Sequence, residues 1–204
     1  SGNVESNELL LSLAKSSALI VCADGGASYL QRAGIIPHVL IGDFDSIEPA
    51  LLNSFKALDV EIVKYPSKKD FTDMELALDY AVKRGATRIF IMGATGSRLD
   101  HTLSNIQLLH KLADSGVEGV IANENNFIYL ITSSIELCKK DGYKLSLLPA
   151  SETVEGITTQ GLAYPLKDAV LHVGTGLGIS NEFMDEKASV SIKSGKLYVI
   201  VSRD

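Results

Sequence analysis

Tryptophan is absent from this 204-residue sequence, and cysteine occurs only twice, as Cys22 and Cys138. Two cysteines so far apart indicate neither a disulfide framework nor a zinc motif, and the four histidines lack the close spacing of a zinc-binding pair. No apolar run is long enough to cross a bilayer, and the first residues lack the pattern of a signal peptide. These absences argue against a disulfide-stapled secreted protein, a zinc protein and a membrane protein, so we expect a cytoplasmic location.

Basic residues are also in short supply. The chain has 19 lysines and arginines against 25 acidic residues, a formal net charge of −6. This balance argues against a nucleic-acid partner, whose binding surface is normally basic. It favours a cationic small molecule, or a site whose acids are neutralised by a metal ion. The 46% hydrophobic content is enough for a real core, in one large domain or two small ones.

Two periodicities divide the sequence. Up to about residue 124, amphipathic helical patterns alternate with short apolar runs closed by turn signals, which is typical of buried strands in a parallel sheet. Beyond the polar stretch 123–126, short apolar runs follow a period of two, as in antiparallel strands of a sandwich or barrel. The sequence therefore predicts an α/β fold class, with a Rossmann-like parallel-sheet domain over residues 1–124 and an all-β sandwich domain over residues 125–204.

The first half is organised around the stretch 41–47, which reads Ile-Gly-Asp-Phe-Asp-Ser-Ile. An apolar run leads into Gly42 and then into two carboxylates, Asp43 and Asp45. Ligands of open α/β sheets lie at the carboxyl ends of such strands. Two neighbouring acids repel each other unless a cation lies between them or one is protonated, and oxygen ligands facing phosphates are the usual way of holding Mg²⁺. The alternative is an ordinary turn, since aspartate also favours turns.

Three further acidic stretches follow predicted strands. They contain the following residues: Asp24 with Gly25 and Gly26, Asp70 with Asp73, and Asp100. Each stretch alone has an ordinary explanation, because glycines tighten turns and acids at a helix start are stabilised by the helix dipole by ~0.3–1 kcal/mol. If the strands are parallel, however, their carboxyl ends meet at one edge of the sheet. Acids at four strand ends therefore favour a site for metal-bridged phosphoryl transfer over four independent turns.

Two residues near these acids could serve either structure or phosphate binding. Thr72, three residues before Glu75, fits the capping box of a helix start. Arg98 lies in a glycine-containing loop, Gly93–His101, which lacks the Gly-Lys-Ser/Thr ending of a P-loop, and could supply the charge of the P-loop lysine. The helix after this loop is expected from about residue 102 to residue 114.

Five motifs occur in a fixed order: Ala-Asp-Gly-Gly-Ala, Gly-Asp-Phe-Asp-Ser, Lys-Asp-Phe-Thr-Asp, Gly-Ser-Arg-Leu-Asp-His and Ile-Ser-Asn-Glu-Phe. In this combination the chain resembles the thiamine pyrophosphokinase family over nearly its whole length. The resemblance implies an N-terminal α/β domain, a C-terminal β-sandwich and a homodimer that builds its active sites between subunits. It also implies a transferase that moves a pyrophosphoryl group from ATP to thiamine, with Mg²⁺, giving thiamine diphosphate and AMP. One departure is that the chain opens at 1–3 without the apolar strand usual in the family.

The resemblance also implies roles for individual residues. By position, Asp43, Asp45 and Asp73 resemble the Mg²⁺ ligands, and Asp70 and Asp100 lie in the same acidic pocket. The candidate catalytic residues are therefore Asp43, Asp70, Asp73, Asp100 and Arg98. The candidate nucleotide- and thiamine-binding residues are Asp24, Gly25, Gly26, Lys69, Thr72, Ser180 and Asn181, of which the last two match the segment that meets the thiamine pyrimidine.

Two other functions remain open on the sequence alone. A phosphatase with an aspartyl nucleophile would also place an Asp-x-Asp motif, here Asp43-Phe44-Asp45, after a strand. A thiamine- or nucleotide-binding protein without catalysis would keep the same binding residues. Incubation with ATP and thiamine separates these functions by their products.

Overall fold

A computed structural model describes residues 2–4 and 6–204 and divides the chain into two compact units. The first comprises Ser1–Val117 and Ala122–Glu124, and the second comprises Glu118–Ile121 and Asn125–Asp204. Residues 118–121, which belong to the first domain in the sequence-based division, thus cluster with the second unit. Within the described residues, no helix is both long and apolar enough to cross a membrane.

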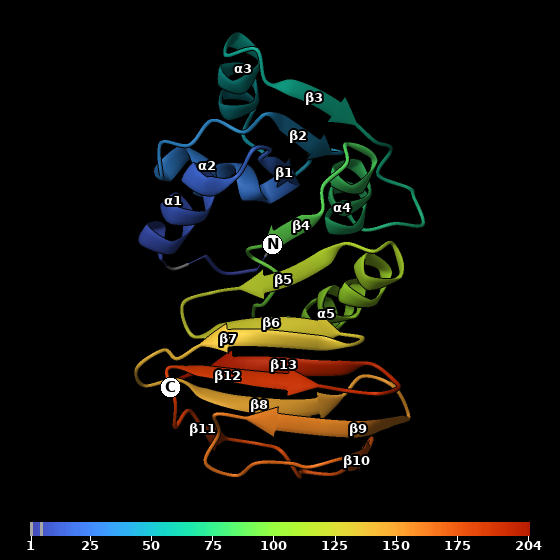
Figure 1. Ribbon diagram of the computed structural model, residues 1–204. Coiled ribbons are helices and arrows are strands. Elements are labelled where there is room, and N and C mark those ends of the chain that lie inside the picture. The colour runs from blue at the N-terminus through green and yellow to red at the C-terminus, as the bar shows by residue number, and fades with distance from the viewer. Residues whose placement is uncertain (1, 5) are drawn as a thin grey trace. The chain divides into compact units, whose positions relative to one another are not determined.

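The first unit mixes helices with short parallel strands (Figure 1). Its helices are α1 (Asn7–Ser16), the short 3-10 helix η1 (Asp24–Gly26), α2 (Ala27–Arg32), α3 (Pro49–Ala57), α4 (Asp73–Lys83) and α5 (Leu99–Asp114). Its strands are β1 (Val21–Ala23), β2 (Val39–Gly42), β3 (Glu61–Lys64) and β4 (Arg88–Ile91). Strands β1, β2 and β3 form a parallel sheet in that order, and β4 lies outside it.

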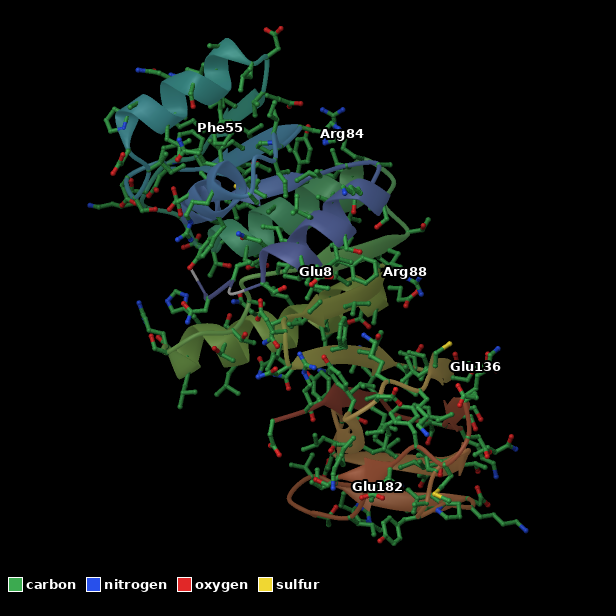
Figure 2. All side chains as sticks on the ribbon, turned by 90° about the vertical axis from the view of Figure 1, so that its left-hand side faces the viewer. Glu8, Phe55, Arg84, Arg88, Glu136 and Glu182 are labelled. Atoms are coloured by element: carbon green, nitrogen blue, oxygen red, sulfur yellow. The ribbon has the colours of Figure 1, made fainter. Side chains whose placement is uncertain are left out.

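The middle strand of this sheet, β2, is buried on both faces. Leu40 is fully buried in one apolar cluster with Phe55 of α3, which is labelled in Figure 2. Val39 and Ile41 are buried in a second cluster with Leu76 of α4. Fully burying such a side chain contributes roughly 1.5–3 kcal/mol, so β2 is a rigid support for the residues that follow it.

Side-chain caps fix two helix starts in the first unit, those of α1 and α4. The hydroxyl of Ser6 accepts a hydrogen bond from the backbone N–H of Leu9 at 3.1 Å and caps α1. Thr72 caps α4 in the same way through the N–H of Glu75, at 3.2 Å, as the capping pattern predicts. The start expected for the helix after the glycine loop is wrong by about one turn: α5 begins at Leu99, so Asp100 lies in its first turn, where an acid is favourable.

The second unit consists mainly of antiparallel strands, as the period of two predicts. Its strands are β5 (Glu118–Ala122), β6 (Asn126–Ile131), β7 (Ser134–Cys138), β8 (Lys144–Pro149), β9 (Thr153–Gln160), β10 (Ala169–His172), β11 (Asn181–Glu182), β12 (Lys187–Ser191) and β13 (Leu197–Ser202). One sheet has the order β10-β9-β12-β7, and the other contains the run β11-β8-β13-β6-β5. Alternate residues of β13 are buried, which gives this sheet a core-facing side.

Candidate active site

Three carboxylates gather at the carboxyl ends of β1 and β2. Asp24 directly follows β1, and Asp43 and Asp45 follow β2. Strands β1 and β2 are parallel, and Ala23 pairs with Ile41. The residues that follow the two strands therefore leave the sheet at the same edge. One carboxylate oxygen of each of the three aspartates lies within 4.8 Å of the others. The structure therefore brings together two of the acidic stretches that the sequence singles out.

The backbone around these carboxylates is unusual. Asp24 and Phe44 have positive φ angles of 35° and 65°, in a region that non-glycine residues rarely adopt. Gly42 has a φ of +155°, and a Cβ there would lie 3.0 Å from the Cβ of Asp24. A glycine is therefore needed where β2 passes β1. Such strain clusters at functional sites.

The hydrogen bonds of the three acids leave negative charge uncompensated. Asp24 Oδ2 accepts a hydrogen bond from the hydroxyl of Ser46, and Asp43 Oδ1 accepts one from the backbone N–H of Asp45 at 3.3 Å. Asp24 Oδ1 is buried and has no hydrogen-bond partner among the described residues. Buried polar atoms are normally satisfied, so this oxygen is suited to bind a cation. Hard carboxylate oxygens at this spacing fit a divalent ion such as Mg²⁺.

Mutual repulsion separates the pKa values of the two acids after β2. The negative charge of Asp43 raises the pKa of Asp45 above 3.8, and loss of solvation and the charge of Asp24 add to the effect. The pKa of Asp43 is lowered, first by the backbone hydrogen bond from Asp45 and then by a hydrogen bond from the Ser67 side chain. Asp45 is therefore the carboxyl of this pair that binds a proton more readily.

Asp73 and Lys69 form an ion pair beside this group. Asp73 is the first residue of α4, after the cap at Thr72. Its Oδ1 lies 2.6 Å from Lys69 Nζ, and the side chains of Lys69 and Asp73 are 13% and 30% exposed. Both charges act on the acids after β2, since Asp73 contributes to raising the pKa of Asp45 and Lys69 contributes to lowering that of Asp43.

Arg98 and Asp100 pair with each other. Arg98 Nη2 lies 2.6 Å from Asp100 Oδ2, and the two side chains are 69% and 65% exposed. Hydrogen bonds from Arg98 are the main reason that the pKa of Asp100 falls to about 2. Among the described residues, neither Asp100 nor the exposed Asp70 belongs to the group of three close carboxylates.

The loop before Arg98 packs against the first residues of the chain. Gly2 N–H donates to the carbonyl of Gly93 at 3.0 Å, and Asn3 N–H donates to that of Thr95 at 2.9 Å. A Cβ on Gly2 would lie 2.2 Å from the carbonyl oxygen of Thr95. This close approach of two backbones accounts for the glycine at position 2, and phosphate binding by the loop stays a prediction.

Ser180 and Asn181 lie in the second unit and differ in their surroundings. Ser180 is exposed and has a φ of 58°, and its backbone N–H donates to the hydroxyl of Ser146 at 2.9 Å. Asn181 is 5% exposed. Its Oδ1 accepts hydrogen bonds from the N–H groups of Tyr164 at 3.0 Å and Glu182 at 2.9 Å, and its Nδ2 donates to the carbonyl of Tyr164 at 2.7 Å. The amide of Asn181 is thus engaged within the unit.

Sequence reasoning missed Ser46 and Ser67, whose side chains hydrogen-bond Asp24 and Asp43. Ser46 directly follows the Asp-Phe-Asp motif, and this position was the available signal. Ser67 had no comparable signal, because it reaches Asp43 only through the fold. Both hydroxyls orient carboxylates that already repel one another.

Comparisons with known proteins agree over most of the chain. Family models described as "Thiamin pyrophosphokinase, catalytic domain" and "Thiamin pyrophosphokinase, vitamin B1 binding domain" match residues 10–121 and 132–197. Thiamine pyrophosphokinase of Bacillus subtilis is 35% identical over 188 residues, 91% of this chain and 88% of that protein.

Solved structures give the same result. The crystal structure of thiamine pyrophosphokinase from Bacillus subtilis matches with a TM-score of 0.91 and 32% identity, covering 100% of this chain and 96% of that chain. The structure of thiamin pyrophosphokinase from Geobacillus thermodenitrificans has a TM-score of 0.85 and 33% identity, covering 100% and 95%. The chain therefore belongs to the thiamine pyrophosphokinase family.

Proposed function

We propose that the acidic edge of the first unit, formed by Asp24, Asp43 and Asp45 with the nearby Asp73, binds ATP with Mg²⁺. We also propose that the second unit supplies Ser180 and Asn181 to the thiamine site. As a thiamine pyrophosphokinase, the chain makes thiamine diphosphate. The observation that supports the location is the group of three close carboxylates, one with a buried oxygen that has no hydrogen-bond partner within the described part of the chain. The proposed reaction transfers the pyrophosphoryl group of ATP to the hydroxyl of thiamine and releases AMP.

The proposed metal ligands are the carboxylates at the sheet edge. Asp43 and Asp45 provide two, Asp24 adds the buried oxygen, and Asp73 completes the set when Lys69 releases it. Bound there, Mg²⁺ would neutralise the negative charge that builds on the phosphate oxygens during transfer. Ser46 and Ser67 would hold Asp24 and Asp43 in orientation, so that little rearrangement is needed when the ion binds.

The nucleotide would lie against residues around this edge. Gly25 and Gly26 carry no side chain and let backbone N–H groups come close to phosphate. Arg98 would exchange its exposed partner Asp100 for a phosphate group, which arginine can bind through two parallel hydrogen bonds. Thr72 caps the start of α4, and the exposed Asp70 lies two residues before Thr72. A carboxylate of this region would accept the proton of the thiamine hydroxyl, a poor nucleophile without such help.

In the thiamine site, the two predicted residues would have different tasks. Ser180 presents its exposed side chain toward the ligand. Asn181 holds Ser180 in position, because its amide ties the segment to Tyr164. The thiazolium ring of thiamine carries a permanent positive charge, so the excess of acidic residues in the chain attracts it.

A homodimer with active sites between subunits is part of the proposal. Several apolar side chains of the second unit are largely exposed: Tyr164, Val173, Leu177, Ile179 and Met184. Exposed apolar surface of this kind often marks an interface, and closed twofold dimers are the commonest soluble assembly.

We also propose that the first unit is Rossmann-like and that the second is a sandwich. The proposed domain boundary follows residue 124, and the proposed location is cytoplasmic.

Mixing two inactive variants tests the shared site. Under subunit exchange, an Asp73→Asn protein and an Asn181→Ala protein should recover part of the activity. One site of each mixed dimer then carries both changes and the other carries neither. Mixed dimers that form but remain inactive would show that each site is built within one chain.

The function itself is tested by the products. With Mg²⁺, ATP and thiamine, the protein should release AMP and thiamine diphosphate in equal amounts. Formation of ADP and thiamine monophosphate would contradict the proposed transfer. Free phosphate with a trapped aspartyl phosphate would instead support the phosphatase alternative, and binding without turnover would support the non-catalytic one.

A further inference from the structure

Lys69 is held more tightly than most cations of this chain. Its side chain is only 13% exposed, its Nζ lies 2.6 Å from Asp73 Oδ1, and the same Nζ lies 5.8 Å from the centre of the Tyr65 ring. By contrast, the Arg98–Asp100 ion pair exposes 69% and 65% of its side chains. The neighbouring Lys68 is exposed. Surface ion pairs are mobile and weak, whereas the ammonium of Lys69 has a defined position.

That position lies between two parts of the acidic edge. Lys69 contacts Asp73 directly, and its charge also stabilises the charged form of Asp43. Asp43 in turn belongs to the group of close carboxylates with Asp24 and Asp45. The ammonium therefore supplies part of the positive charge that these acids need.

An ammonium and a divalent ion cannot both take the same side of one carboxylate oxygen. Mg²⁺ binds its oxygen ligands at about 2.0–2.1 Å, and Asp73 Oδ1 is already bound by Lys69 Nζ. A metal that takes the side of this oxygen now occupied by Lys69 must displace the ammonium. Once displaced, Lys69 has three N–H donors and no acceptor, so the phosphate oxygens of a metal-bound nucleotide are its natural new partners.

We propose that Lys69 is an internal counter-cation that competes with the divalent metal for Asp73 and moves to the nucleotide phosphates when the metal binds. This inference rests on the proposed metal site and adds to it an exchange of partners. Metal binding removes Asp73 as the partner of Lys69, and nucleotide binding provides phosphate oxygens as new partners. Each kind of binding therefore strengthens the other. Lys69 is then a positioning residue for the metal as well as a ligand of the nucleotide.

Metal affinity without nucleotide tests the competition. Free Mn²⁺, used in place of Mg²⁺, is measured by electron paramagnetic resonance in titrations of the wild type, Lys69→Met and the control Lys68→Met. Removing the competitor should tighten Mn²⁺ binding roughly tenfold in Lys69→Met and change it less than twofold in Lys68→Met. Equal or weaker binding by Lys69→Met overturns the proposal. Circular dichroism checks that each variant is folded.

A second pair of variants separates direct competition from the general effect of one positive charge. In an Asp73→Asn background, Lys69 has lost its ionic partner and acts only through its charge on Asp43, so Lys69→Met should tighten Mn²⁺ binding clearly less than it does in the wild type. If the tightening is as large in this background as in the wild type, Lys69 acts only through long-range charge and the competition is refuted.

Nucleotide affinity tests the second half of the exchange. With saturating Mg²⁺, Lys69→Met should bind a non-hydrolysable ATP analogue at least fivefold more weakly than the wild type, by calorimetry, while Lys68→Met should not. Unchanged affinity in Lys69→Met contradicts the move to phosphate. If neither the wild type nor Lys69→Met binds Mn²⁺, with or without the analogue, the proposed metal site is wrong and the inference falls with it. If the wild type binds Mn²⁺ and Lys69→Met binds it no more tightly, only the inference fails.

Discussion

Buried polar groups are treated differently in two regions of the molecule. These regions are the acidic edge of the first unit and the Ser180–Asn181 segment of the second. At the acidic edge, Asp24 Oδ1 is buried without a hydrogen-bond partner among the residues that the structure describes, close to two further carboxylates. In the second unit, the buried Asn181 amide has both its oxygen and its nitrogen bound within the unit. We therefore expect a cation from outside to complete the first region, whereas the hydrogen bonds of the second are made within the unit.

The energetic consequences differ accordingly. Two like charges 4 Å apart repel each other by about 1 kcal/mol in bulk water and about 4 kcal/mol near a protein surface. The fold bears this repulsion at the acidic edge, where the strained φ angles of Asp24 and Phe44 also lie. Each satisfied hydrogen bond of Asn181 instead contributes about 0.5–1.5 kcal/mol to stability. Substitutions should thus harm function in the first region and folding in the second.

The largest expected effect is at the acidic edge. Asp43→Asn removes a proposed metal ligand and one of the repelling charges, so turnover should fall about a hundredfold or more. The free energy of unfolding should stay the same or rise. Steady-state rates and urea unfolding measure the two quantities. Asp59→Asn is the matched control, because Asp59 precedes β3 and lies away from its carboxyl end. Full activity of Asp43→Asn at saturating Mg²⁺ would mean that Asp43 is only a turn residue.

The second unit should show the reverse pattern. Asn181→Ala leaves the N–H and the carbonyl of Tyr164 without their partner, and should lower the free energy of unfolding by about 2–3 kcal/mol.

The neighbouring Ser180→Ala removes only an exposed hydroxyl and should change stability by less than about 0.5 kcal/mol. It should raise the KM for thiamine about fivefold, the effect of losing one hydrogen bond. Urea unfolding and kinetics on both variants separate these outcomes. A stable Asn181→Ala protein would show that its buried amide does not support the segment.

The smallest expected effect is a difference in titration between the two acids after β2. The pKa of Asp45 is raised above 3.8 by the charge of Asp43, and that of Asp43 is lowered. As the pH falls in metal-free protein, Asp45 should therefore take up its proton first. Carboxyl ¹³C NMR measures both midpoints. In Asp43→Asn the midpoint of Asp45 should move to lower pH, because its main cause of elevation is gone. Identical midpoints in the wild type would count against a close pair.

The comparison also explains what the sequence could predict. Short-range signals were sufficient for the caps at Ser6 and Thr72 and for the buried strand that carries Asp43 and Asp45. The convergence of acids followed from the rule for parallel strands and holds for Asp24 with Asp43 and Asp45.

Other features depend on contacts between residues far apart in the chain. Nothing local indicates that Asn181 binds the backbone of Tyr164, 17 residues earlier. The close approach of Gly42 to Asp24 and that of Gly2 to Thr95 likewise appear only in the fold. The start of α5 was placed about one turn late because Arg98, which caps it without a side-chain hydrogen bond, is not a typical capping residue.

Amide hydrogen exchange with and without Mg²⁺ tests the central claim most directly, namely that the acidic edge is completed by a cation and the Ser180–Asn181 segment is not. Mg²⁺ should slow exchange several-fold at residues 24–26 and 42–46 and leave residues 163–164 and 180–182 unchanged. The slowing should disappear in Asp43→Asn. No change at the acidic edge, or an equal change in both regions, would contradict the account.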